Sequence, residues 1–108
     1  MPDSQVLFRL EAALYQRKSA APGSSYVASL YAKGLDAVLK KVGEEATEAI
    51  LAAKGDDKSH LTREAADLLF HILVMLAAKD VALADVLAEL ERREGTSGLD
   101  EKKSRKES

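Results

Sequence analysis

The chain lacks cysteine and tryptophan, and it has only two prolines, two histidines, two phenylalanines and three tyrosines. Without cysteine there can be no disulfide bond, zinc–thiolate site or cysteine nucleophile. With His60 and His71 as the only histidines, a histidine-rich metal site is not expected. The few aromatic side chains provide no extended stacking surface, and a formal net charge of −2 does not favour a basic nucleic-acid binder. No nucleic-acid partner is therefore expected.

Long hydrophobic runs are also absent. The longest continuous apolar run covers residues 72–78, well short of the ~20 residues that span a bilayer, and the N-terminus does not read as a signal peptide. We therefore expect a soluble intracellular protein with no membrane partner. A length of 108 residues predicts one compact domain, here residues 1–95, followed by a polar charged tail, residues 96–108.

Helix-forming residues dominate what is present. Alanine, leucine, glutamate and lysine are abundant, both prolines precede residue 23, and no segment alternates like a strand. A short helix capped by Ser24 or Ser25 is expected to end near Lys33, and Ser59 is the expected N-cap of a later helix. The four main helices are predicted at residues 4–18, 35–54, 60–79 and 84–93.

These segments predict an all-α fold, with four main antiparallel helices plus the short helix in a bundle-like arrangement. The stretch from Leu68 to Leu76 is apolar nearly all round, which is typical of a helix buried on every side. One small chain can hardly cover such a helix. We therefore predict that a second copy completes the bundle, and a monomeric mass by light scattering would contradict this.

Carboxylates are the main source of candidate chemistry. At about 100° per residue, Glu45 and Glu48 lie on one edge of the apolar face of their helix, and Glu64 and Asp67 lie similarly on the next helix. Glu44 points mostly outward. Two antiparallel helices joined by a short loop would bring these two acidic pairs together.

Such carboxylates repel one another unless a cation offsets their charge, and Mg²⁺ with a phosphorylated ligand suits an all-oxygen site. A ferritin-like di-iron centre is disfavoured because it needs Glu-x-x-His pairs. Each pair could also be an ordinary solvated helix face, so the spacing alone leaves metal binding open. Lys41, one turn before Glu45, fits either a surface salt bridge or a phosphate contact. His71 fits either a core histidine or a substrate contact.

The chain resembles a known family at these positions. Glu44, Glu45 and Glu48, followed after fifteen residues by Glu64 and Asp67, match the E-E-x-x-E…E-x-x-D signature of the MazG-like, all-α nucleoside triphosphate pyrophosphohydrolases. Longer matching segments narrow the resemblance to the phosphoribosyl-ATP pyrophosphohydrolases. These segments cover residues 25–30, 34–48, 63–71 and 90–98.

The resemblance implies hydrolysis of 1-(5-phosphoribosyl)-ATP to 1-(5-phosphoribosyl)-AMP and pyrophosphate, the second step of histidine biosynthesis. It also implies Mg²⁺ dependence, a homodimer and a cytoplasmic location. By motif position it makes Glu45, Glu48, Glu64 and Asp67 metal ligands, with Glu48 and Glu44 in the catalytic set. Glu44 would position water or support the other acids.

The absence of a P-loop leaves phosphate binding to the metal and to basic side chains. We expect Lys41, with Lys102, Lys103 and Arg105 of the tail, to supply this charge, and His71 to join the substrate-binding set. Two other interpretations stay open. One is a related enzyme for non-canonical or excess nucleoside triphosphates, and the other is a non-catalytic helical interaction module, which predicts no effect of Mg²⁺ on melting.

The small net charge is the sum of segments that differ in sign and size of charge. Residues 1–41 carry six basic and three acidic groups, whereas residues 42–67 carry three basic and seven acidic groups. The remaining residues carry seven basic and eight acidic groups. The most negative segment therefore contains both acidic motifs, and bound divalent cations would make it receptive to a polyphosphate.

Overall fold

The computed structural model describes residues 1–95, 98, 102, 103 and 105, and within them the chain is helical without a strand. The all-α prediction is confirmed, and each predicted main helix lies within two residues of an observed one. The elements are α1 (Val6–Lys18), the 3₁₀ turn η1 (Pro22–Ser24), α2 (Tyr26–Lys33), α3 (Leu35–Lys54), α4 (Lys58–Ala78) and α5 (Leu83–Arg93).

Short polar side chains set two of the helix starts. The Ser25 hydroxyl accepts a hydrogen bond from the Ala28 N–H at the start of α2, as expected for an N-cap. The predicted cap of α4 is wrong by two positions, because Asp57 performs this role. Its carboxylate accepts from the N–H groups of Ser59 and His60 at 3.0 and 3.1 Å.

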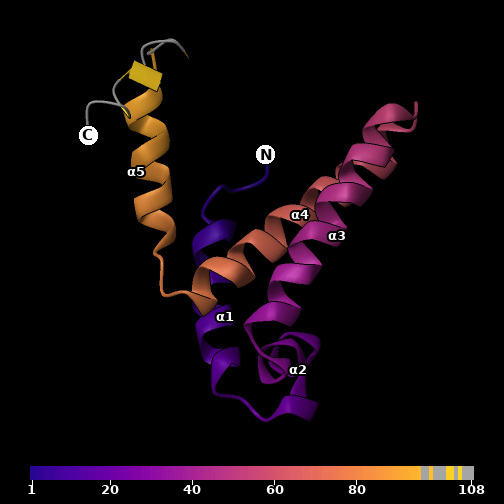
Figure 1. The fold of residues 1–108 in the computed structure, drawn as a ribbon, viewed down its shortest axis with the longest axis vertical. Helices are drawn as coiled ribbons and strands as arrows, with labels where there is room; N and C mark the ends of the chain where they lie inside the picture. Colours follow the sequence, from indigo (N-terminus) through magenta and orange to yellow (C-terminus); the bar gives the residue numbers. More distant parts are fainter. Residues whose placement is uncertain (96–97, 99–101, 104, 106–108) are drawn as a thin grey trace.

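The helices α3 and α4 form an antiparallel hairpin, joined by residues 55–57, as Figure 1 shows. Gly34, with a φ of 102°, separates α2 from α3 in a backbone conformation that side chains other than glycine rarely adopt. The helices α1 and α2 pack against the hairpin on its other end. Their shared core consists of Leu14, Val27, Leu30, Val38, Leu73, Val74, Ala77 and Leu83.

Helix α5 is attached mainly at its start. Leu83 is buried, and its N–H donates a 2.8 Å hydrogen bond to the Glu11 carboxylate of α1. Lys18 fixes the preceding turn, because its ammonium donates to the Ala77 carbonyl at 2.7 Å and to Asp80 at 2.9 Å. Beyond this anchor, α5 extends away from the α3–α4 hairpin (Figure 1). Most of the predicted tail, residues 96–108, lies outside the described residues, so the division of the chain at residue 95 stays a prediction.

The single chain leaves large apolar side chains on its surface. On α3 it buries the side that carries Val38, Glu45 and Ala52, while Ile50 remains 64% exposed. On α4, Leu69 is 55% exposed although it lies in the stretch from Leu68 to Leu76 that is apolar nearly all round. The sequence predicted that one copy would not cover this helix on every side, and the exposure of Leu69 agrees with this. None of the helices in the described part of the chain is both long and apolar enough to cross a membrane.

Candidate metal centre and active site

Three of the predicted carboxylates meet between α3 and α4. One oxygen from each of Glu45, Glu48 and Glu64 lies within 4.8 Å of the others. The group forms because Glu45 and Glu48 are one helical turn apart on α3, and the short connection at residues 55–57 brings Glu64 of α4 opposite them. Glu45 is only 6% exposed, although Glu48 remains open to solvent.

Two oxygens of this group, Oε2 of Glu45 and Oε2 of Glu64, are buried, and neither has a hydrogen-bond partner within the described part of the chain. A buried carboxylate oxygen without a partner costs free energy, which a bound cation would offset. The donor set also contains only oxygen, the ligand that hard divalent cations prefer. The residues present therefore fit a divalent cation.

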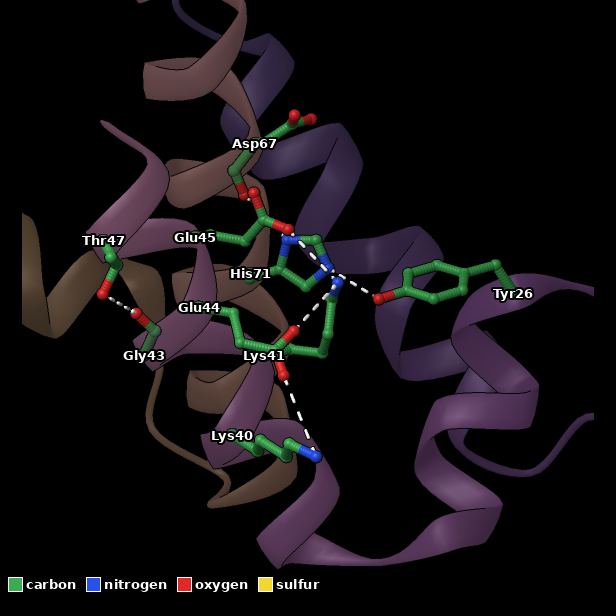
Figure 2. A network of polar contacts seen from close by, with 9 residues as sticks. All are labelled: Tyr26, Lys40, Lys41, Gly43, Glu44, Glu45, Thr47, Asp67 and His71. Atoms are coloured by element: carbon green, nitrogen blue, oxygen red, sulfur yellow. Dashed lines mark hydrogen bonds and ion pairs between the residues drawn. The ribbon is translucent and has the colours of Figure 1, made fainter. Parts of the chain in front are cut away.

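Lys41 supplies positive charge at one edge of the group. Its ammonium lies 3.2 Å from Glu45 Oε1 and 3.6 Å from Glu44 Oε2, and Figure 2 shows it between these two side chains. Its hydrogen bond to Glu45 raises the pKa of Lys41. Glu44 is 44% exposed and also faces Lys40 at 4.0 Å, which agrees with its predicted outward direction. Lys41 thus makes a salt bridge at the rim of the site, which was one of its two predicted roles, and its phosphate contact stays a prediction.

Asp67 is the predicted ligand that does not join the group. Asp67 is exposed, and Figure 2 shows its carboxylate pointing away from Glu45. Its backbone carbonyl instead accepts a 2.8 Å hydrogen bond from Nδ1 of His71. Asp67 can therefore join a metal site at Glu45 only after its side chain rotates.

His71 is buried, with 6% of its surface exposed, and both ring nitrogens are engaged. Because a carbonyl can only accept, Nδ1 carries the proton that binds Asp67, and in the neutral ring Nε2 is then an acceptor. The Tyr26 hydroxyl therefore donates to Nε2 at 2.8 Å, as the dashed line in Figure 2 indicates. For a neutral imidazole, this pair of bonds selects the tautomer with the proton on Nδ1.

Tyr26 is the residue beside the site that sequence reasoning missed. It belongs to the segment 25–30, which resembles the family, but nothing in its spacing connects it to His71 of α4, which lies 45 residues later. Burial raises the pKa of the Tyr26 hydroxyl, with smaller effects from Lys41, Glu45 and other nearby charges. The hydroxyl thus stays protonated and remains a hydrogen-bond donor near neutral pH.

The basic residues predicted in the tail lie elsewhere in the single chain. Lys102, Lys103 and Arg105 are exposed. Figure 1 shows the described yellow segment of the chain at the far end of α5, apart from the α3–α4 hairpin. Among the described residues, no hydrogen bond or ion pair joins Lys102 or Lys103 to the acidic group.

The charge of Glu45, assisted by hydrogen bonds to Glu45 and Glu64, raises the pKa of Glu48. A raised carboxyl pKa means that the folded protein binds a proton more readily than the unfolded chain. In the metal-free protein, stability from this group is therefore gained as the pH falls through the folded pKa and is lost as the pH rises. We expect Glu48→Gln to raise Tm at about pH 7 in EDTA, and to change it little near pH 4.

Thermal melts across this pH range would check the prediction, with Glu91→Gln, an exposed acid of α5, as the control. An equal difference between variant and wild type at both pH values would contradict it.

The similarity of the chain to known proteins extends beyond the motif. Residues 7–94 match the family model described as phosphoribosyl-ATP pyrophosphohydrolase. A protein of Azoarcus sp. (strain BH72) is 58% identical over 106 residues, or 98% of this chain and 99% of that protein. One from Dinoroseobacter shibae is 62% identical over 100 residues, or 93% of this chain and 98% of that protein. Both relatives are named phosphoribosyl-ATP pyrophosphatase.

Proposed function

The chain belongs to the phosphoribosyl-ATP pyrophosphohydrolase family, and we propose that the acidic group between α3 and α4 is its catalytic centre. The family's reaction converts 1-(5-phosphoribosyl)-ATP to 1-(5-phosphoribosyl)-AMP and pyrophosphate, a step of histidine biosynthesis. This is the function of the chain. The single observation that supports the location is the convergence of Glu45, Glu48 and Glu64 with two buried carboxylate oxygens left without partners.

Mg²⁺ is the cation that we propose for this site, held by Glu45, Glu48 and Glu64 and by Asp67 once its side chain turns inward. When bound, Mg²⁺ would neutralise charge on the phosphate oxygens and on the leaving pyrophosphate. Carboxylates with a few waters and substrate phosphates are the usual ligands of this ion. The buried unpartnered oxygens support the proposal because they are strong acceptors that no protein donor satisfies.

The side chains around the cation would have separate tasks. Glu48 lies open to solvent, where it would take a proton from an attacking water. Glu44 would help to position this water from the outer edge. Lys41 lies close enough to Glu45 and Glu44 to approach the phosphates, where its ammonium would offset negative charge.

A homodimer is the proposed assembly. Ile50 lies two residues after Glu48, and Leu69 lies two residues after Asp67, so each is about 200° round its helix from the acidic residue. Both side chains are more than half exposed, and their burial by a second copy would leave the acidic side of each helix accessible. If Lys102, Lys103 and Arg105 contact the phosphates, we propose that they do so in the partner's site. A cytoplasmic location also stays a prediction.

The activity can be tested by offering phosphoribosyl-ATP and a panel of nucleoside triphosphates, with and without Mg²⁺. We expect pyrophosphate from phosphoribosyl-ATP in the presence of the ion and almost none in EDTA. The phosphate product would be identified by ³¹P NMR. Release of orthophosphate, or a preference for an ordinary triphosphate, would contradict the assignment.

A further inference from the structure

A cavity beside the acidic group has no role in the hydrolysis described above. It has a volume of about 320 Å³ and lies between α1 and the start of α2, with Phe70 of α4 as a further wall. Leu10, Ala13 and Leu14 supply its apolar lining from one face of α1, and Tyr26 closes another side. Its size falls within the range of small-molecule sites, about 300–1,000 Å³.

Two aromatic walls connect this cavity to the acidic group. The rings of Tyr26 and Phe70 both meet the His71 ring edge-on, with centroids 5.8 and 5.3 Å away. His71 is in turn bonded to the Asp67 carbonyl, and the Tyr26 hydroxyl is bonded to His71. The walls are therefore held in fixed orientations next to the carboxylates. A flat, rigid aromatic surface of this kind suits a nucleobase, which gains affinity by stacking.

Arg17 adds a positive charge to the same cavity. Its guanidinium makes no hydrogen bond or ion pair within the part of the chain that the structure describes, and the residue is exposed. The neighbouring Lys18 binds the Ala77 carbonyl, ten residues beyond Asp67 along α4. Arg17 therefore borders the cavity on the side away from the acidic group, where it is available to a second anionic group.

We propose that this cavity binds the adenine ring of the substrate and that Arg17 binds the phosphate of its second ribose. The inference rests on the proposed function, because phosphoribosyl-ATP carries its triphosphate on one side of the base and a ribose 5-phosphate on the other. The order acidic group, aromatic walls and arginine matches the order triphosphate, adenine and phosphate. The arrangement gives a physical reason to prefer phosphoribosyl-ATP to ATP, which lacks the second phosphate.

Binding of the product and of AMP, measured by calorimetry without metal, separates the two parts of the proposal. Ala13→Phe, which fills the cavity, is expected to weaken binding of both ligands by about 10- to 100-fold. Arg17→Gln is expected to weaken only 1-(5-phosphoribosyl)-AMP, by about tenfold or more, and so to remove its advantage over AMP. Ala12→Phe and Arg9→Gln are the matched controls, since both residues lie exposed on α1 and do not line the cavity.

Each result has a defined meaning. Wild-type binding by both Ala13→Phe and Arg17→Gln would overturn the inference, as would an equal loss of AMP and 1-(5-phosphoribosyl)-AMP in Arg17→Gln. A changed molecular mass of Ala13→Phe would identify the cavity as a contact between copies and would also overturn it. Failure of the proposed function is distinguishable, because that failure appears as no pyrophosphate release by the wild type in Mg²⁺.

Discussion

Replacement of Glu45 by glutamine is expected to lower the turnover of phosphoribosyl-ATP by at least about 100-fold while the helical fold persists. Glu45 is the most buried member of the acidic group, and its Oε2 atom has no partner among the described residues. A glutamine has nearly the same shape but lacks the negative charge that holds a cation. The loss should therefore appear in metal binding as well as in the rate.

Metal binding can be followed without activity. At a Mg²⁺ concentration of 100 times its Kd, binding stabilises the folded state by about 2.7 kcal/mol, which corresponds to a rise in Tm of about 10 °C for a chain of this size. We expect this rise in the wild type and not in Glu45→Gln, and Asp67→Asn should behave similarly if its side chain rotates into the site.

The control for this experiment is Glu89→Gln. Hydrogen bonds from Arg92 and Arg93 lower the pKa of the Glu89 carboxyl to about 2, and the residue lies on α5, outside the acidic group. This variant should retain its activity and its response to Mg²⁺. Near-wild-type turnover in both Glu45→Gln and Asp67→Asn would refute the metal-site model.

The double substitution of Ile50 and Leu69 by glutamine is expected to convert a dimer into a monomer. Both side chains are more than half exposed in the single chain, and a dimer would bury two copies of each. At about 1.5–3 kcal/mol for each buried side chain, their loss would weaken association by more than about 1,000-fold. Light scattering should then give about 11.7 kDa for the variant and about twice that mass for the wild type.

Val6→Gln is a suitable control, because Val6 is also an exposed apolar residue but lies at the start of α1. It should leave the mass of the wild type unchanged. The Tm of the wild type should also rise with protein concentration, since dissociation accompanies unfolding. A wild-type mass of 11.7 kDa at all concentrations would refute the dimer.

The sequence predicted the helices well because their signals are local. Ser25 marked the start of one helix, and the helical spacing correctly placed Glu45, Glu48 and Glu64 on facing sides. The angles alone did not show which side of α3 would be covered. The side of α3 that carries Glu45 is covered, because α4 and α2 pack against it. The side that carries Ile50 stays exposed, because no described element covers it.

Two features of the site depend on more distant contacts. Tyr26 approaches His71 only because α2 packs on the hairpin, and no local pattern contains this information. The Asp67 carboxylate points away from Glu45 although its backbone position fits the motif, since rotation about its side-chain bonds is not determined by helical spacing. Three of the four carboxylates predicted as ligands thus converge, whereas the side-chain conformation of Asp67 was not predicted.

The carboxylates of the proposed metal centre all come from one hairpin, with the three-residue connection at positions 55–57 between its helices. The entropy lost on closing a loop grows with its length, so bringing positions 45 and 64 together costs less than joining either one to α1. Contacts of this kind are also the ones that form fast in folding chains. The proposed chemistry thus lies at a local tertiary contact, and the packing of α1 and α2 shapes what surrounds it.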